Sequence, residues 1–131
     1  MELSPEDIAM LKSLNFAHLV TLNPDGGPHS TPLWIDVDAE GHVIVNSAVG
    51  RRKDRNIRRD PRVALSLQPQ DDPYTWISIQ GTVVSIETGH EAEVHIDTLN
   101  RRYHEGEAWT YVQGQQRVIY RIRADRILRS D

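Results

Sequence analysis

The segment HVIVNSAVGRRKDRNIRRDPRVALSLQ, residues 42–68, holds the pattern that decides the fold: an apolar strand, a basic helix and a second apolar strand. Residues 42–47 and 63–68 are rich in valine, isoleucine and leucine, which is typical of β-strands. We predict a helix over residues 51–59 that ends at Asp60, because the residue before a proline is disfavoured in helical backbone. The segment therefore predicts a strand that leads through a short loop into a basic helix.

The rest of the chain adds further strands and two more helices. Ser4 and Pro5 predict the start of a helix near the N-terminus, because serine caps helices and proline suits the first helical position. Residues 89–104 are predicted to form another helix, since apolar residues recur there at helical spacing. The predicted strands span residues 16–22, 29–38, 42–47, 63–68, 74–87 and 117–128.

Two of these strands contain residues that disturb regular pairing. Pro32 interrupts the strand over 29–38, which predicts an edge strand, a bulge, or backbone that faces something other than a strand. Gly81 predicts a bend or a bulge in the strand over 74–87.

Many strands joined by tight turns, with few and short helices, favour a small β-barrel over a doubly wound parallel sheet. We therefore predict a mainly β fold of about six strands with two or three short flanking helices. The chain shows no internal repeat and no linker, so residues 1–131 are expected to form a single domain.

The composition excludes several classes of function. The 131 residues carry a net charge of −4, and 38% are hydrophobic, which is ordinary for a soluble globular protein. The absence of cysteine excludes disulfides, thiolate metal sites and cysteine catalysis. No apolar run is long enough to span a membrane, and the N-terminus lacks a signal-peptide pattern. We expect a cytoplasmic protein that does not bind membranes.

Residues 46–62 carry seven basic and two acidic side chains, whereas the rest of the chain has eight basic and seventeen acidic ones. Three explanations are open: a solvated helix face, a nucleic-acid contact, or a site for a small phosphate or polycarboxylate. The acidity of the whole chain argues against nucleic acid. The small-anion site is favoured, because a helix start presents backbone N–H groups beside three cations, Arg51, Arg52 and Lys53. Gly50 would let an anion approach closely.

The histidines and serines give no catalytic or metal motif. His90 and His95 lie five residues apart, which on a helix is about 140° of rotation, so they cannot easily share a metal ion. No serine lies in a Gly-x-Ser-x-Gly motif. We expect no metal site, and the sequence identifies no catalytic residue.

Four segments carry a family resemblance: LVTLNPDGGPHSTPLW (19–34), GRRKDRNIRRDPRVALS (50–66), WISIQGTVV (76–84) and RVIYRIRADRIL (117–128). They resemble the pyridoxamine 5'-phosphate oxidase-like, FMN-binding split-barrel family, in particular its subgroup of probable coenzyme F420-dependent oxidoreductases. The resemblance implies a split β-barrel that forms a homodimer, with cofactor sites at the interface and a small-molecule substrate.

The resemblance also implies which residues bind the cofactor. The basic loop and helix hold the cofactor phosphate in the family, which implicates Arg51, Arg52, Lys53 and Asn56. The flavin-type ring lies along the second strand, which implicates Thr31, Pro32 and Leu33. The remaining candidates are Asn46 and Ser47 on the third strand, Trp76 on the facing strand, and Trp109 and Tyr111 in the C-terminal half, which closes the partner's site.

The resemblance implies a coenzyme F420-dependent reductase, which transfers hydride from the reduced deazaflavin to a small organic substrate with an electron-poor double bond. Both this cofactor and flavin mononucleotide (FMN) carry one phosphate, but the deazaflavin adds a tail with several carboxylates. Such a tail would provide a ligand for the further cations Arg55, Arg58 and Arg59. An FMN-dependent oxidoreductase of the same fold, and a non-catalytic carrier of coenzyme F420 or flavin, remain the alternatives.

Overall fold

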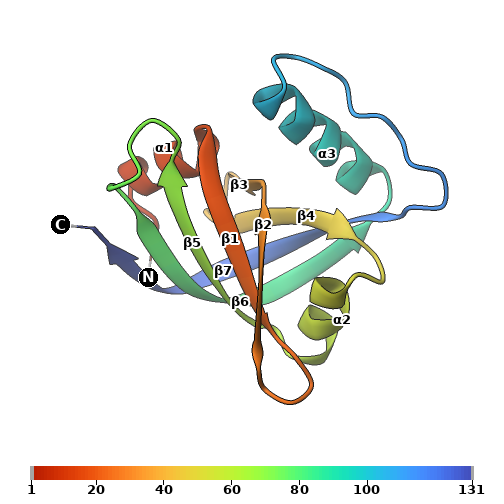
Figure 1. The fold of residues 1–131 in the computed structure, drawn as a ribbon, viewed down its shortest axis with the longest axis horizontal. Coiled ribbons are helices and arrows are strands. Elements are labelled where there is room, and N and C mark those ends of the chain that lie inside the picture. Colours follow the sequence, from red (N-terminus) through yellow and green to blue (C-terminus); the bar gives the residue numbers. More distant parts are fainter. Residues whose placement is uncertain (1, 131) are drawn as a thin grey trace.

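The computed structural model describes residues 2–130, which form a seven-stranded antiparallel sheet and three α-helices (Figure 1). Within these residues, no helix is long and apolar enough to cross a membrane. The helices are α1 (Pro5–Lys12), α2 (Arg52–Arg59) and α3 (His90–Tyr103). The strands are β1 (Asn15–Leu22), β2 (Pro28–Leu33), β3 (Ile35–Val37), β4 (Val43–Ala48), β5 (Arg62–Pro69), β6 (Ile77–Thr88) and β7 (Arg117–Arg129).

A single residue joins the two opposite edges of the sheet. The strand order is β2-β1-β5-β6-β7-β4-β3, so β2 and β3 are the edge strands. Only Trp34 separates the end of β2 at Leu33 from the start of β3 at Ile35. Two residue steps span at most about 7 Å, so the sheet must curl until its edges approach each other. The mainly β, split-barrel fold predicted from the sequence is confirmed.

The segment predicted as one strand over 29–38 forms two strands, and this raises the number of strands from about six to seven. The chain breaks at Trp34 and not at Pro32, because it passes there from one edge of the barrel to the other. Pro32 lies in the edge strand β2, where it pairs with His18 of β1 and has no second neighbouring strand. The edge-strand alternative is therefore correct, and an edge strand is where a proline without an N–H is tolerated.

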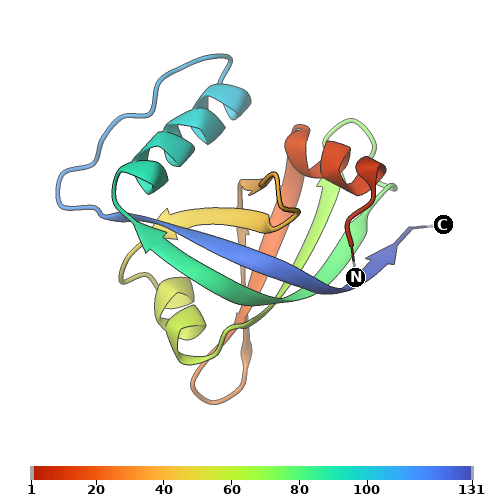
Figure 2. The same cartoon turned by 180° about the vertical axis from the view of Figure 1, so that it is seen from behind.

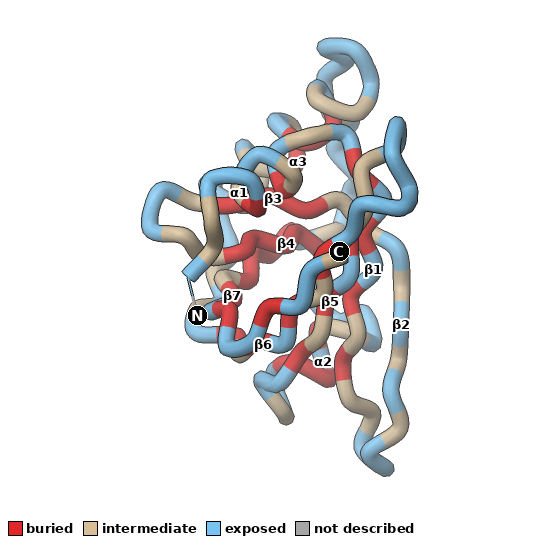
Figure 3. Tube along the Cα trace, turned by 90° about the vertical axis from the view of Figure 1, so that its left-hand side faces the viewer, coloured by how far each residue is buried: buried red, intermediate tan, exposed pale blue. Residues whose placement is uncertain are grey.

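Two helices close the ends of the barrel. Leu11 of α1 and Ile57 of α2 both belong to the main hydrophobic core, which is otherwise built from the inward-facing residues of the strands. Figures 1 and 2 show α1 and α2 at opposite ends of the curled sheet. In β1, buried residues alternate with exposed or half-buried ones, as Figure 3 shows along the chain. One face of the sheet thus forms the core, and the other faces outward.

The N-terminal helix is capped as predicted and is also anchored to the last strand. The Ser4 hydroxyl accepts a hydrogen bond from the Asp7 N–H at 3.1 Å, and the Asp7 carboxylate accepts one from the Ser4 N–H at 2.8 Å. Arg129 of β7 donates two further hydrogen bonds to Asp7, at 3.0 and 2.6 Å. This reciprocal cap satisfies the first N–H groups of α1 and fixes it over the end of the barrel.

The third helix lies outside the barrel. It packs against β4, β6 and β7 over a small apolar cluster of Ile44, Ala92 and Ile119. Figures 1 and 2 show α3 and the loop that follows it standing away from the body of the barrel. Polar contacts from Glu91, His95 and Arg102 add to this apolar packing.

Gly81 lies at a bulge, as the sequence predicts. The register between β6 and β7 shifts between Gln80 and Gly81. A Cβ atom at position 81 would lie 2.6 Å from both the Arg123 carbonyl oxygen and the Ile122 Cγ2. No side chain can occupy this space without movement of the β7 backbone.

Substitution Gly81→Ala is expected to lower the free energy of unfolding by about 1–3 kcal/mol, because overpacking against backbone forces the two strands apart. Urea denaturation measures the change. Gln80→Ala is the matched control, since Gln80 is exposed on the same strand, and it is expected to stay within about 0.5 kcal/mol of the unsubstituted protein. Equal stability of Gly81→Ala and the unsubstituted chain would contradict the close approach.

Candidate functional site

A cleft of about 680 Å³ lies beside the seam where the two edges of the sheet meet. Its walls come from β1, β2, β4, the end of β5, the start of α2, one side of α3, and the loop before β7 with the first residue of β7. Asn46 of β4 and Leu33 of β2 face it from the two sides of the seam. Because β2 has only one neighbouring strand, this part of the barrel is available to a ligand.

The two ends of the cleft differ in chemistry. Near the start of β1, the rings of Trp34 and Tyr103 stack with their centroids 5.1 Å apart and their planes 10° from parallel. The Tyr103 hydroxyl lies there 3.4 Å from the backbone nitrogen of Asn15. At the other end, toward α2, the lining side chains include Arg51, Lys53 and Arg117. No aspartate or glutamate lines the cleft within residues 2–130.

The three cations repel one another. Burial, together with the charges of Arg51 and Arg117, lowers the pKa of Lys53. Burial and the charge of Arg51 likewise lower the pKa of Arg117 to about 10, so this side chain remains charged at neutral pH. None of the three forms an ion pair with a carboxylate in the described part of the chain. This end of the cleft is thus suited to an anion.

The buried carboxylate of Asp54 fixes the start of α2 and, with it, the positions of the cations. It accepts hydrogen bonds from the Gly50 N–H at 2.9 Å, the Tyr120 hydroxyl at 2.5 Å and the Arg58 Nε at 3.0 Å. Gly50 has a φ of +92°, a conformation that glycine adopts without strain. The Gly50 N–H is therefore used inside the protein, and the expectation that the backbone N–H groups of this loop face an anion is wrong at this residue.

The hydrogen bonds around Asp54 decide its ionisation. Burial raises the pKa of Asp54, but the bonds from Gly50, Tyr120 and Arg58 outweigh it and leave the pKa below its ordinary value. Burial and the neighbouring Asp54 carboxylate raise the pKa of Tyr120. At neutral pH the pair is an ionised carboxylate that accepts a hydrogen bond from a neutral phenol.

Arg117 is a feature of the site that the sequence analysis missed. Only 5% of this residue is exposed, its Nε donates to the Asn46 Oδ1 at 2.9 Å, and its Nη1 donates to the Gln115 Oε1 at 3.1 Å. The guanidinium lies 5.2 Å from the ring centre of Trp109. In the sequence, Arg117 begins a strand in which charged and apolar residues alternate, and such charges are ordinarily exposed.

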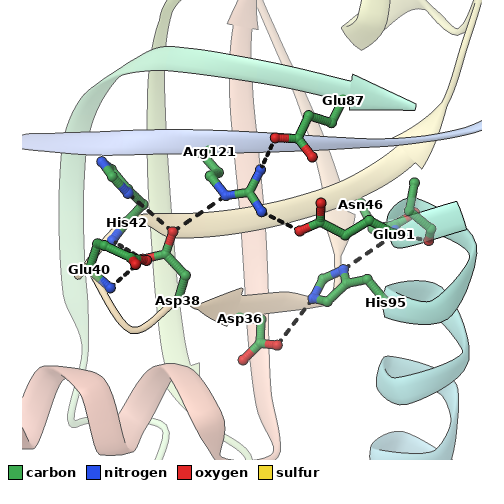
Figure 4. A network of polar contacts seen from close by, with 10 residues as sticks. Asp36, Asp38, Glu40, His42, Asn46, Glu87, Glu91, His95 and Arg121 are labelled. Carbon is green, nitrogen blue, oxygen red and sulfur yellow. Dashed lines mark hydrogen bonds and ion pairs between the residues drawn. The ribbon is translucent and has the colours of Figure 1, made fainter. Parts of the chain in front are cut away.

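A polar chain holds α3 against the edge of the sheet and orients Asn46 (Figure 4). The Asn46 Nδ2 donates to the Ala92 carbonyl oxygen at 2.9 Å and lies 3.3 Å from the His95 Nδ1. The His95 Nε2 lies 3.1 Å from the Asp36 Oδ2. With its amide nitrogen so engaged, Asn46 turns its oxygen to Arg117.

Six of the twelve residues predicted to bind a cofactor line the cleft. These are Pro32, Leu33, Asn46, Arg51, Lys53 and Trp109. Thr31, Ser47, Arg52, Asn56, Trp76 and Tyr111 do not line it. The structure thus brings half of the predicted residues together, while the binding role of all twelve stays a prediction.

The residues outside the cleft have other surroundings. The Asn56 Nδ2 donates to the Thr21 Oγ1 at 3.0 Å, so this side chain joins α2 to β1. Trp76 and Tyr111 are exposed, one before β6 and the other in the loop before β7. The hydroxyls of Thr31 and Ser47 are buried with no hydrogen-bond partner in residues 2–130, and Arg52 is exposed with its Nη1 3.5 Å from the Asn23 Oδ1.

Two of the further arginines of α2 are engaged within the protein. Arg58 donates to Asp54, and Arg59 donates to the Leu22 carbonyl oxygen and to Asn56. Arg55 is exposed. Fewer cations are therefore free to bind a carboxylate tail than the sequence suggests.

The sequence analysis also missed one group of possible metal ligands. Asp38, Glu40 and His42 place their ligand atoms within 4.8 Å of one another at the turn between β3 and β4 (Figure 4). The Asp38 Oδ2 already faces the His42 Nδ1 at 3.1 Å and the Arg121 Nε at 3.5 Å. The guanidinium thus supplies positive charge to this carboxylate, and nothing else at the turn indicates a metal ion.

Comparison with known proteins yields a family and several relatives. The family described as "Pyridoxamine 5'-phosphate oxidase" matches residues 3–130. A protein of Streptomyces rimosus subsp. rimosus, the 5a,11a-dehydrotetracycline/5a,11a-dehydrooxytetracycline reductase, is 30% identical over 96 residues, which cover 68% of each chain.

Solved structures are similar over nearly the whole chain. A structure named "F420 Reductase" is 30% identical with a TM-score of 0.78, and the match covers 92% of this chain and 94% of the other. A conserved hypothetical protein from Mycobacterium tuberculosis is 28% identical with a TM-score of 0.76, covering 98% of this chain and 85% of the other.

Substitution Asp54→Asn is expected to lower the free energy of unfolding at pH 7 by about 1–3 kcal/mol, because hydrogen bonds to a charged, buried acceptor are weakened. The folded-state pKa of Asp54 lies below its unfolded value of about 3.9. Its contribution is therefore present above that pH and is lost as the pH falls through the folded-state pKa. The difference between the two proteins should shrink as the pH is lowered from 7 towards 3.

Chemical denaturation at several pH values measures this difference. Asp71→Asn, at an exposed position in the loop after β5, controls for the loss of one negative charge. A difference between the Asp54→Asn variant and the unsubstituted protein that is constant with pH would show that the Asp54 carboxylate does not stabilise the fold.

Proposed function

The chain belongs to the pyridoxamine 5'-phosphate oxidase family, and we propose that it is a coenzyme F420-dependent oxidoreductase. The observation that carries the proposal is the division of the cleft into a cationic end, with Arg51 and Lys53, and an aromatic end, with Trp34 and Tyr103. Such a cleft suits a ligand with an anionic group at one end and a flat ring system at the other. The likeness to the structure named "F420 Reductase" supports this choice of cofactor.

The proposal gives the lining residues distinct tasks. Arg51 and Lys53 would bind the cofactor phosphate, and Pro32 and Leu33 of β2 would lie along the ring. The reduced deazaflavin supplies a hydride when it is bound. The protein therefore has to bind the cofactor, orient its ring and exclude water. The fixed amide of Asn46 and the apolar wall of α3, which includes Ile96 and Leu99, would hold the ring in one orientation.

The substrate would be a small organic molecule with an electron-poor double bond. The aromatic end of the cleft, lined by Phe16, Trp34 and Tyr103, offers apolar and stacking surface to such a molecule. The dehydrotetracycline reductase from Streptomyces rimosus supports the reaction type, because its name describes a reduction.

We also propose that the protein forms a homodimer through the outer face of the sheet. The strand registers place His18, Ser66, Ser78 and Leu128 in one row across β1, β5, β6 and β7. His18 also lines the cleft, so the outer face continues into the site. Phe16 and Leu128 on this face are 52% and 56% exposed. A second copy seated on the row would cover this apolar surface and close the cleft on the side of β1.

One of the two alternatives has specific support. An FMN-dependent oxidoreductase of the same fold gains weight from the engagement of Arg58 and Arg59 within the protein, because fewer cations remain for a carboxylate tail. A non-catalytic carrier remains open, because an anion site accounts for binding and not for turnover.

The first test is a parallel titration of the purified protein with coenzyme F420 and with FMN, followed by tryptophan fluorescence at two salt concentrations. Tight, salt-sensitive binding of coenzyme F420 with weak FMN binding is expected, and loss of the reduced cofactor spectrum with a substrate distinguishes an enzyme from a carrier. A preference for FMN would contradict the proposed cofactor.

The double substitution Arg51→Ala and Lys53→Ala is expected to weaken cofactor binding at least tenfold, about 1.4 kcal/mol, because charged hydrogen bonds to the phosphate are removed. Arg123→Ala with Arg126→Ala removes two exposed cations of β7 and serves as the matched control. Unchanged affinity in the first variant would disprove the assignment of the phosphate site.

Sedimentation velocity at micromolar concentration tests the homodimer. We expect a dimer for the unsubstituted chain and a monomer for Phe16→Asp with Leu128→Asp, because two buried carboxylates would oppose association. Gln113→Asp, in the exposed loop between α3 and β7 and away from this face, controls for added charge. A monomeric unsubstituted chain would refute the interface.

A further inference from the structure

We infer that Arg117 is the third arm of a site for a doubly charged, phosphate-type group at the cationic end of the cleft, together with Arg51 and Lys53. The inference deepens the proposed function and rests on it for the identity of the ligand, since a cofactor phosphate would occupy the site. Neither the sequence analysis nor the family match assigns a role to Arg117.

The first argument is the way in which Arg117 is held. Its Nε and Nη1 donate to the neutral oxygens of Asn46 and Gln115, and its flat face lies over Trp109. These contacts fix the plane of the guanidinium. Its Nη2 has no hydrogen-bond partner in residues 2–130, and it is not among the polar atoms that the fold buries without one. A fixed arginine with an unused donor at a cleft is preorganised to bind an anion.

The second argument is the balance of charge. Arg117 is buried beside two further cations, whereas buried arginines are ordinarily paired with a carboxylate. Arg121, by comparison, is also largely buried and has carboxylates of Asp38, Glu87 and Glu91 as partners. The charge of Glu93 offsets only part of the desolvation cost of Arg117, whose pKa stays lowered, and a bound anion would offset more of it.

The third argument is the directions from which the cations approach. Arg51 comes from the loop before α2, Lys53 from the first turn of α2 and Arg117 from the first residue of β7. A tetrahedral group presents oxygens to three separate directions, whereas a planar carboxylate presents two in one plane. Three positive charges also match a double negative charge better than a single one. A phosphomonoester, or a phosphodiester with an adjacent carboxylate, has this chemistry.

The position of Asn46 explains how Arg117 keeps its orientation. The Asn46 amide is anchored through its nitrogen by the Ala92 carbonyl oxygen and the His95 ring, so its oxygen is presented to the Arg117 Nε. Asp36 in turn faces the other nitrogen of His95 (Figure 4). The anion site is thus supported by α3 as well as by the barrel, and Asn46 acts as a positioning residue.

The test uses the whole chain and inorganic ions, so it does not depend on a cofactor. Thermal unfolding is followed with phosphate, sulfate or acetate at equal ionic strength, for the unsubstituted protein, Arg117→Gln and the control Arg126→Gln on the exposed side of the same strand. Phosphate and sulfate are expected to raise the midpoint of the unsubstituted protein and the control, and acetate is not. The apparent affinity for phosphate should fall at least tenfold in Arg117→Gln.

The midpoint temperature of thermal unfolding without added anion distinguishes an anion-binding role of Arg117 from a purely structural one. If Arg117 is kept for an anion, Arg117→Gln should unfold at the same or a higher temperature, because an unpaired buried charge is removed. A lower midpoint together with an unchanged response to phosphate would overturn the inference. Equal responses of the unsubstituted protein to phosphate and acetate would also overturn it. Arg117→Lys keeps the positive charge but lacks the planar set of N–H donors of a guanidinium, and it is expected to bind phosphate with intermediate affinity.

Titrations of the same variants with coenzyme F420 and FMN show which proposal fails. If phosphate binding depends on Arg117 but neither cofactor binds, the anion site stands and the proposed function falls. The unsubstituted protein and Arg117→Gln could bind a cofactor with equal affinity, while Arg51→Ala with Lys53→Ala binds it more weakly. In that case the proposed function is supported and the role of Arg117 is disproved. Tenfold weaker binding of one cofactor to Arg117→Gln identifies which phosphate group occupies the site.

Discussion

The one-residue link through Trp34 is the constraint on which the rest of the structure depends. It joins strands at opposite edges of a seven-stranded sheet, so the sheet has to curl, and the two edges meet without a ladder of hydrogen bonds between them. The seam leaves a place where a ligand can lie against strand backbone. Pro32 and Leu33 come to the cleft from one edge and Asn46 from β4, next to the other edge. The constraint that shapes the barrel therefore also creates the site.

Electrostatics divides the cleft along its length. Asp54 uses its carboxylate to anchor α2 to Tyr120 and the Gly50 N–H, so the negative charge that α2 carries in its first turn is turned inward. Arg51 and Lys53, at the N-terminus of α2, form no ion pair with a described carboxylate. Their charge is concentrated at one end, while the aromatic rings occupy the other. Under the proposed function, this division would let an amphiphilic cofactor bind in one direction only, which is the condition for orienting a reactive ring.

The fold could be predicted from the sequence to the extent that its signals were local. The caps of α1, the helix over 51–59 and the bulge at Gly81 follow from residue types at fixed spacing, and the structure confirms them. The break at Trp34 could not be predicted, because it follows from the closure of the sheet, which depends on the order of all seven strands. For the same reason the segment over 29–38 was expected to be a single strand.

The site was predictable only in part, for a similar reason. Arg51 and Lys53 stand out as a local cluster of charge, and they line the cleft. Arg117 is separated from them by more than sixty residues and lies in a strand of alternating charge, so only the pairing of β7 with β4 brings it near. Asn56, one helical turn after Lys53 in the sequence, donates a hydrogen bond to Thr21 and does not line the cleft.

The most direct test of the account is the response of the three tryptophan indole N–H signals in ¹H–¹⁵N nuclear magnetic resonance spectra during a titration with coenzyme F420. Trp34 and Trp109 line the cleft, one in the aromatic end and one beside Arg117, whereas Trp76 does not line it. The account predicts saturable shifts of the Trp34 and Trp109 signals at the same cofactor concentration. A titration that shifts only Trp76, or none of the three signals, would contradict it.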